Sequence, residues 1–574
     1  MKRWILGLIF VLALFLRVWN LAQVPEAIDE DEMALGYYGY SLLVNQSDEY
    51  GNKFPLYFES AGDYKYGFYS YLAAIPVGIL GLNSFSTRIV AALAGALSVI
   101  AIYYLALEIF KKEKFALISA FVLAMAPTHI HFSRVAYNNV LGALFAITSI
   151  IYLIRWLKKG SRKNTILTLT FYILAILSYQ AYRVYMPIVF VLLSLVMYKK
   201  TAPKRRVKVI LLAALSVIVV ALSLVSPKSR ARSQNFSLLY NTPKLTEQSA
   251  EDNKASTPLI LTRVFHNKII SAGMGFFSRY ATYFDPQFLF VQTTSGTERH
   301  SIPDMGLLYL IEAPLFLLGL LSLFLLLKKE SKFIPLILLF AGPVAASLVI
   351  ESRSTTRAII IIYAYALITA LGIYSISNTK KLGKYLPPLI LVAYFFNFLY
   401  FSHQYLVHKK YHHPWHSDVG LKEMVDVVNN NYDDYTNIVM SGGHYIPYLF
   451  YNKVHPEEFV EKSDFAPQAL TNGVKVTRFD KIIFNMPYEC PPAGKIDTLY
   501  VCFGYQVPKN ANVVEVIRFR DEQPAIIVVE FLPLAERGSL MVLPERLEYN
   551  KDVDLRFKEG ILPDTYESFW PITK

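Results

Sequence analysis

The first group of residues in this chain whose types and spacing are suited to chemistry is a run of four carboxylates at residues 29–32. They follow an apolar N-terminal run, where neither membrane insertion nor packing requires charge. A carboxylate in this acidic quartet could act as general base on a hydroxyl group or ligate a divalent cation. Alternatively, the quartet is a solvated turn that caps a helix beginning near Met33, because carboxylates complement the positive end of a helix.

A second polar cluster, Gly62-Asp63-Tyr64-Lys65-Tyr66, lies in a segment rich in aromatic residues. The ammonium group of Lys65 can pair with a phosphate as a compact point charge. Aromatic residues are also typical of the belt at a membrane–water interface, which accounts for most of those in this segment.

Basic side chains recur where apolar runs end. They are Arg17, His131, Arg134, Arg183, Arg353 and Arg357. The positive-inside rule disfavours arginine on the outer face of a membrane, so several guanidinium groups there need a reason. Convergent guanidinium groups suit bidentate binding of a phosphate, whereas snorkelling to phospholipid headgroups is the alternative for any single one. Their joint occurrence favours the phosphate site.

Composition indicates that these residues belong to a membrane protein. Of the 574 residues 54% are hydrophobic, and the mean hydropathy is +0.34. Soluble domains contain about 45–50% apolar residues, so the excess indicates a polytopic membrane protein. The net charge of +13 arises from lysine and arginine in short turns, not from an extended basic face, which argues against nucleic-acid binding.

Eleven apolar runs are long enough to span a bilayer. They lie near residues 4–20, 87–110, 115–131, 139–157, 164–180, 183–198, 208–226, 306–327, 333–350, 357–376 and 385–402. Alternation then places five basic turns on one side, near residues 111–114, 158–163, 199–208, 328–332 and 380–384. The positive-inside rule makes that side cytoplasmic. The first outer loop (21–86), the large outer loop (227–305) and the tail (from residue 403 onward) are therefore expected on the extracytoplasmic side. Residues 68–82 are expected to form an interfacial helix.

The composition changes at residue 403. An amphipathic helix is expected over residues 419–431, and strands near 437–440, 481–485, 498–504, 513–519 and 525–531. This pattern predicts an extracytoplasmic α/β domain over 403–574, after a transmembrane domain over 1–402.

Two further features of the tail have modest signals. Cys490 and Cys502, if outside, could form a disulfide that closes a short loop. His412, His413 and His416 lack paired carboxylates at a set spacing, so a juxtamembrane anchor is a better interpretation than a metal site.

Several short motifs recur together over residues 1–400. They are Arg17-Val18-Trp19-Asn20-Leu21, Asp31-Glu32 with Gly36-Tyr37, Asp48-Glu49-Tyr50-Gly51, Gly62-Asp63-Tyr64-Lys65, Phe85-Ser86-Thr87-Arg88, His131-Phe132-Ser133-Arg134, Tyr182-Arg183, Phe288-Leu289-Phe290 and Arg299-His300-Ser301. This combination resembles the bacterial family 39-type glycosyltransferases, which have the GT-C fold. They are relatives of dolichyl-phosphate-mannose–protein mannosyltransferases and of lipid A aminoarabinose transferases.

The resemblance implies inverting transfer of a sugar from a polyprenyl-phosphate donor to an extracytoplasmic acceptor on a protein, lipid or envelope glycan. Asp31 matches the catalytic carboxylate of the family, with Glu32 beside it. The donor phosphate is expected to be bound by Lys65, Arg134, Arg183 and Arg357, and the substrate to be contacted by Asp63, Tyr64, Tyr182, Arg299 and His300. Lipid A transferases have Lys-Pro-Pro where this chain has Lys65-Tyr66-Gly67. Members of this kind need no tightly bound metal, so no cofactor is expected.

Three alternatives remain. A lipid-linked-sugar flippase or transporter would carry ionisable residues near the membrane centre, whereas the charges here gather at one face. A non-catalytic scaffold would not require the acidic quartet. Oligosaccharyl transfer is the nearest alternative enzyme activity, although no acceptor-sequon motif is evident. The sequence thus predicts a mainly α, multi-pass protein of the plasma or inner membrane, whose site faces outward to membrane lipids, a lipid-linked donor and an acceptor.

Overall fold

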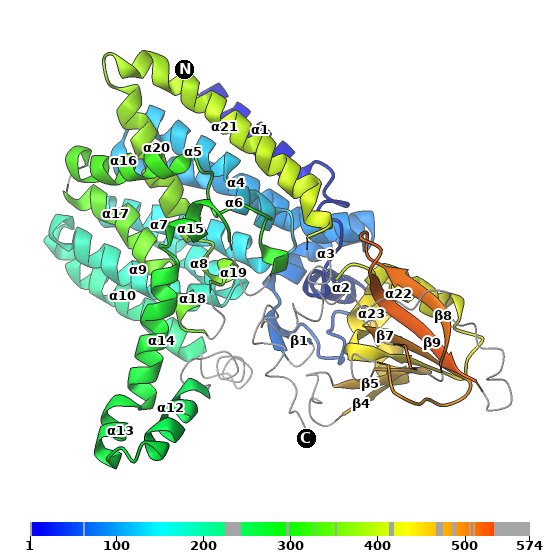
Figure 1. Ribbon diagram of the computed structural model, residues 1–574. Coiled ribbons are helices and arrows are strands. Elements are labelled where there is room, and N and C mark those ends of the chain that lie inside the picture. The colour runs from blue at the N-terminus through cyan, green and yellow to red at the C-terminus, as the bar shows by residue number, and fades with distance from the viewer. Residues whose placement is uncertain are drawn as a thin grey trace. The chain divides into compact units, whose positions relative to one another are not determined.

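A computed structural model describes residues 3–60, 63–223, 243–293, 298–327, 329–349, 353–412, 418–466, 475–484, 490–503, 507–508 and 511–532. Helices predominate (Figure 1). The chain divides into two compact units. Unit 1 comprises Met1–Trp19 and Val90–Tyr405, and unit 2 comprises Asn20–Ile89 and Leu406–Lys574.

Unit 1 is built from helices. They are α1 (Arg3–Val18), α4 (Ser84–Phe110, mostly in this unit), α5 (Glu113–Met125), α6 (Pro127–Ser133), α7 (Asn138–Lys159), α8 (Arg162–Ser178), α9 (Ala181–Met197), α10 (Pro203–Ser223), α12 (Pro243–Lys254), α13 (Leu259–Phe265), α14 (Lys268–Thr282), α15 (Pro286–Phe290), α16 (Glu312–Leu326), α17 (Lys329–Ala341), α18 (Val344–Ser347), α19 (Thr355–Ala358), α20 (Ile361–Ser377) and α21 (Leu382–Leu406). Each apolar run expected to span the membrane falls on one or two of these helices, so the helical prediction is confirmed.

The number of membrane spans stays a prediction. Within the described ranges, 4 helices are long and apolar enough to cross a membrane, or up to 5 if the bent pair α5–α6 is one span. This pair bends by 63° at Pro127, which cannot continue the hydrogen-bond ladder of α5. Shorter apolar helices, among them α9 and α20, lie below that length.

Close packing of α16 and α20 shows why small residues occur inside apolar helices. A Cβ atom on Gly319 would collide with the carbonyl oxygen of Ile368, and one on Gly372 with the carbonyl oxygen of Leu315. The two backbones therefore approach closely only because both positions are glycine, as in other membrane helix pairs.

Unit 2 combines helices with two sheets. Its helices are α2 (Glu30–Val44), α3 (Phe68–Leu80), α22 (Leu421–Asn430), α23 (Tyr445–Asn452) and α24 (Pro456–Lys462). Its strands are β1 (Tyr57–Ser60), β2 (Asp63–Tyr66), β3 (Asn437–Met440), β4 (Ser463–Phe465), β5 (Val476–Phe479), β6 (Ile482–Ile483), β7 (Thr498–Phe503), β8 (Ala511–Arg518) and β9 (Pro524–Phe531). β1 and β2 form an antiparallel hairpin, and the other strands form one sheet in the order β4-β5-β6-β3-β7-β9-β8.

Within this larger sheet, β3 is parallel to β6 and β7, and the remaining neighbours are antiparallel. α22 and strands β3, β6, β7, β8 and β9 coincide with the helix and strands expected in the tail. Cys490 and Cys502 form a disulfide, which the sequence allowed. His413 and His416 lie outside the described residues, and the role of this cluster stays a prediction.

The first outer loop and the tail share one hydrophobic core in unit 2. Met33 and Tyr37 of α2 and Phe58 of β1 are buried in the same cluster as Val428 of α22 and Ile438 of β3. Charged and polar contacts join the same segments, as between Arg520 and Glu26. The sequence, which predicted a domain boundary at residue 403, gave no sign that residues 20–89 pack with the tail.

Candidate active site

The acidic quartet forms the N-terminus of α2, one turn earlier than the expected start near Met33. Asp29 is the N-cap, and its Oδ1 accepts a hydrogen bond from the backbone N–H of Glu32 at 2.9 Å. The Oε1 of Glu32 accepts in return from the N–H of Asp29 at 3.4 Å, which completes a capping box. The capping interpretation therefore applies to Asp29 and Glu32, both of which are buried.

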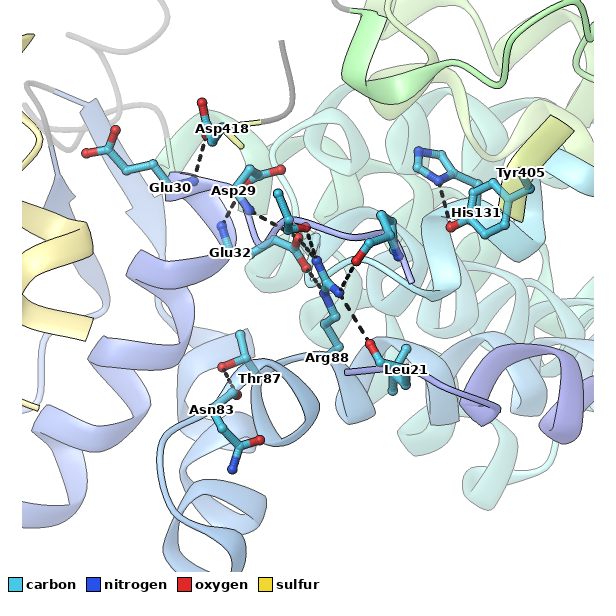
Figure 2. Close-up of polar contacts among 12 residues, drawn as sticks. Leu21, Asp29, Glu30, Glu32, Asn83, Thr87, Arg88, His131, Tyr405 and Asp418 are labelled. Carbon is cyan, nitrogen blue, oxygen red and sulfur yellow. Dashed lines mark hydrogen bonds and ion pairs between the residues drawn. The ribbon is translucent and has the colours of Figure 1, made fainter. Parts of the chain in front are cut away.

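Glu32 also forms a buried ion pair with Arg88 (Figure 2). Nε and Nη2 of Arg88 each lie 2.8 Å from one carboxylate oxygen, so the contact is bidentate. The remaining N–H groups of Arg88 donate to the carbonyl oxygens of Leu21, Pro25 and Ala27. Arg88 thus fastens the chain before α2 to its first turn. The sequence contains Arg88 in a motif but did not suggest this role.

Asp31 and Lys65 come together, as the proposed chemistry requires. The Nζ of Lys65 lies 2.7 Å from the Oδ1 of Asp31. The side chain of Asp31 is 45% exposed and that of Lys65 is 14% exposed. Asp29 caps the helix and Glu32 pairs with Arg88. Of the two residues predicted to be catalytic, Asp31 and Glu32, Asp31 therefore has the more accessible carboxylate. Cation and carboxylate lie side by side.

The neighbours of Lys65 on β2 differ in what the structure shows. The side chain of Asp63 lies outside the described residues. Tyr64 is half-buried, and the desolvation, together with the negative charge of Glu59, raises the pKa of its hydroxyl. Glu59 itself pairs with Lys475 of the tail. The predicted substrate contacts of Asp63 and Tyr64 stay predictions.

Glu49 is a buried carboxyl group that the sequence analysis quoted in a motif without a role. It is fully buried, and the hydroxyl of Tyr445 donates to its Oε1 at 2.6 Å. Burial raises the pKa of Glu49 to about 8, although the hydrogen bond from Tyr445 and the charge of Lys65 oppose the shift. Among the described residues, its Oε2 has no hydrogen-bond partner. Only three-dimensional burial distinguishes this glutamate from a solvated one.

In unit 1, the other predicted site residues gather around the segment 132–139, between α6 and α7. Arg134 lies in this segment, is buried, and donates from Nη1 to the carbonyl oxygen of Leu16 at 2.9 Å. The ring of His300 lies 5.9 Å from that of Phe132 and 5.1 Å from that of Tyr137. Arg299, next to His300, is half-buried.

Two more elements reach this segment through Asn139. The hydroxyl of Tyr182, at the start of α9, donates to the carbonyl oxygen of Asn139 at 3.0 Å, and the adjacent Arg183 is buried. The side chain of Asn139 donates to the carbonyl oxygen of Thr356 at 3.4 Å. Arg357, next in the chain, donates to the Oγ of Ser354 at 2.9 Å. The structure therefore brings three predicted guanidinium residues to elements that meet at one place in unit 1.

Arg17 has a different role from these arginines. It is fully buried, and its guanidinium group donates to the carbonyl oxygens of Leu123 and Ala124, at the C-terminal end of α5. It also contacts Nδ1 of His129 at 2.9 Å. A cation at a helix C-terminus satisfies carbonyl groups left without partners where the helix breaks. Arg17 thus stabilises the α5–α6 bend.

Among the described residues, no group of three or more His, Cys, Asp or Glu side chains could hold a metal ion. Whether the reaction uses a metal stays a prediction from the family resemblance.

Residues 68–228 match the family described as dolichyl-phosphate-mannose-protein mannosyltransferase. No curated protein matches the chain. ArnT from Cupriavidus metallidurans in the apo state has a similar structure, with a TM-score of 0.53 and 11% identity, over 91% of this chain and 97% of ArnT. The undecaprenyl-phosphate-bound form of ArnT gives the same TM-score, 0.53, and identity, 11%, over 92% of this chain and 98% of ArnT.

An oligosaccharyltransferase from Archaeoglobus fulgidus gives a TM-score of 0.47 at 15% identity, over 78% of this chain. The chain spans 61% of the length of that protein. The family match and the fold shared with ArnT agree with the resemblance seen in the sequence motifs. The chain has the GT-C fold that it shares with ArnT.

Proposed function

We propose that this chain is a glycosyltransferase that transfers a sugar from a polyprenyl-phosphate donor to an acceptor outside the cytoplasmic membrane. The observation that carries the proposal is the ion pair of Asp31 and Lys65, which sets a base for the acceptor beside a cation for the phosphate. Support for the donor class comes from the matching family, named for dolichyl phosphate mannose, and from ArnT, which is bound to undecaprenyl phosphate.

The reaction forms one bond and breaks one. The acceptor oxygen or nitrogen attacks the anomeric carbon from the face opposite the phosphate, which inverts its configuration. Asp31 takes the acceptor proton, because a hydroxyl group has a pKa far above neutral and must lose its proton during attack. The bond from the anomeric carbon to the phosphate oxygen breaks, its electron pair stays on the phosphate, and the ammonium group of Lys65 stabilises that charge.

The resting ion pair has a consequence for the donor. Lys65 is the less exposed partner and is carried by the β1–β2 hairpin, whereas Asp31 is the more exposed one. A donor phosphate that reaches Lys65 competes with Asp31 for the ammonium group. Donor binding therefore weakens the ion pair between Lys65 and Asp31.

Arg134, Arg183 and Arg357 of unit 1 are also proposed to bind the donor phosphate, with Tyr182, Arg299 and His300 as substrate contacts. Their meeting around residues 132–139 supports this assignment, since guanidinium groups on converging elements can bind one phosphate bidentately.

The proposal also includes eleven membrane spans, a plasma- or inner-membrane location and outward-facing loops. Cysteines placed at positions 112, 160 and 382 should resist impermeant thiol reagents in intact cells, and one at 245 should react.

A purified sample in lipid nanodiscs tests the proposed function. It is given undecaprenyl-phosphate-linked sugars, singly, with a total envelope extract as acceptor, and release of undecaprenyl phosphate is measured. We expect release of undecaprenyl phosphate that depends on both the donor sugar and the extract, with labelled sugar transferred to one acceptor class. Addition of a chelator should not reduce this activity. Movement of intact donor across the bilayer without release would contradict the proposal and indicate a transporter. Comparison of the lipids and glycans of a deletion strain with its parent identifies sugar and acceptor.

A further inference from the structure

His444 lies at the end of the sheet where parallel strands finish. It follows β3 through η5 (Ser441–Gly443), in which Gly442 and Gly443 have φ of 76° and 74°. These left-handed angles favour glycine and turn the chain sharply after the strand. β3 is parallel to β7, so His444 and Phe503, the last residue of β7, emerge at the same edge. Functional groups often gather at this edge of a sheet.

Two residues of the tail, His444 and Asp418, hold Glu30, the first residue of α2, and a third, Phe503, packs against His444. The Nδ1 of His444 lies 2.9 Å from the Oε2 of Glu30. The backbone N–H of Glu30 donates to the Oδ2 of Asp418 at 3.0 Å, as Figure 2 shows. The ring of Phe503 lies 4.7 Å from the imidazole ring. His444 and Glu30 are largely buried, at 12% and 25% exposure of their side chains.

The charges around His444 favour its protonated form. Burial by itself lowers the pKa of the imidazole, but the charge and hydrogen bond of Glu30 and the charge of Asp418 outweigh it and raise the pKa above 6.5. The ion pair with Glu30 is therefore complete below pH 6.5 and is lost as the pH rises through this higher pKa. Above that pH, the contact between His444 and Glu30 is no longer an ion pair, and the hydrogen bond from the backbone N–H of Glu30 to Asp418 remains.

Asp31 lies between this anchor and a second one. Glu30 precedes it and is held by the tail, whereas Glu32 follows it and is held by Arg88. The backbone of Asp31 is thus held on both sides, through Glu30 and through Glu32, and this sets the direction in which its side chain leaves the helix. Misplacement of a reacting group by about 1 Å can cost about 10²-fold in rate.

We propose that His444, acting through Glu30, is a positioning residue that orients Asp31 for proton transfer and so gives the tail a part in the reaction. This inference rests on the proposed function, because it takes Asp31 as the base. It assigns the tail a role beyond folding. The alternative is that the His444–Glu30 contact only stabilises unit 2.

The test uses the full chain in nanodiscs, with His444→Gln and Glu30→Gln as variants. His455→Gln is the matched control, since His455 is in the same unit and caps α24 through the N–H of Glu457. The transfer rate is measured from pH 6 to 9 with the undecaprenyl-phosphate-linked sugar that is found to be a donor in the assay of the proposed function. The affinity for undecaprenyl phosphate is measured separately. Backbone hydrogen exchange of residues 28–36 is followed over the same pH range as a readout that needs no turnover.

We expect His444→Gln to lower kcat about 10- to 100-fold, with undecaprenyl phosphate affinity unchanged. As the pH rises, the parent should lose transfer activity, and residues 28–36 should lose protection from hydrogen exchange. This alkaline limb of the pH profile should be absent from His444→Gln. Glu30→Gln should move the limb to lower pH, because it removes a charge that stabilises the imidazolium. His455→Gln should match the parent.

Parental kcat, pH profile and exchange in His444→Gln would overturn the inference. If His444→Gln does not fold, Glu30→Gln decides: a limb at the parental pH overturns the inference and an acid shift supports it. Asp31→Asn, measured in parallel, separates the two proposals. Near-parental turnover in Asp31→Asn removes the proposed base, whereas an inactive Asp31→Asn beside a parental His444→Gln contradicts only the role of His444.

Discussion

Lys65 of β2 and Asp31 of α2 form an ion pair at 2.7 Å, with the carboxylate three times as exposed as the ammonium side chain. They are 34 residues apart in the chain, and the hairpin that holds Lys65 returns it to the first turn of α2. This asymmetry suits their proposed roles. The cation is fixed by the fold, and the carboxylate is accessible to an acceptor.

Removal of the Lys65 charge should weaken donor binding and slow turnover together. A charge-assisted contact is worth about 1.5–3 kcal/mol, so Lys65→Met should reduce undecaprenyl phosphate affinity roughly 10- to 150-fold. Lys53→Met is the matched control, because Lys53 is exposed and its ammonium group donates to the backbone and side-chain oxygens of Asn45. Unchanged affinity in Lys65→Met would remove Lys65 from the phosphate site.

The guanidinium groups of unit 1 should respond to the shape of the substituted cation. Arg183→Gln and Arg357→Gln should each weaken donor affinity by about the same factor as Lys65→Met, since each loses a contact to phosphate. Arg183→Lys should recover only part of it, because an ammonium group cannot make a bidentate contact. Titration with undecaprenyl phosphate measures the effect, and Arg155→Gln, which loses a contact to Glu108, is the control. Full recovery by lysine would instead indicate snorkelling to headgroups.

The buried pair of Glu32 and Arg88 should be essential to stability as a pair. Arg88→Met leaves an uncompensated buried carboxylate, which costs about 3–5 kcal/mol. The double variant Arg88→Met/Glu32→Gln should recover much of the lost thermal stability, because it removes the stranded charge. Melting temperatures of the parent, both single variants and the double variant form the cycle. Additive losses would show that the two side chains are not coupled.

Much of this fold follows from local pattern. Long apolar runs predicted the helices of unit 1, and the apolar runs near residues 437, 498 and 525 predicted β3, β7 and β9. The hairpin β1–β2 and strands β4 and β5 were missed, because they are only three or four residues long and contain polar residues. Such short strands depend on partners that a sequence does not show.

The site was predicted in residue type more than in arrangement. The acidic quartet suggested both a cap and a base, and the structure divides these roles by side-chain direction: Asp29 caps and Asp31 is accessible. The burial of Glu49 and the anchoring of α2 by the tail were not predictable. Each depends on contacts between residues about 400 positions apart, such as Tyr445 with Glu49.

Glu49 should make stability fall as the pH rises. Its pKa of about 8 in the folded chain lies above the ordinary 4.5, so the folded state binds more protons than the unfolded state between these values. The free energy of unfolding therefore decreases over this window. Glu49→Gln, which resembles the protonated form, should remove this dependence and be at least as stable as the parent at pH 8. An unaltered pH slope of the melting temperature would refute the assignment.

Asp31→Asn tests the central assignment most directly. The change keeps the side-chain volume at a partly exposed position, so membrane insertion, folding and undecaprenyl phosphate binding should persist. Loss of the general base should lower turnover about 10²- to 10⁴-fold. Asp29→Asn is the matched control, because asparagine caps a helix as well as aspartate and should leave turnover near the parental value. Near-parental turnover in Asp31→Asn, with loss in Asp29→Asn, would contradict the account and place the base two residues earlier.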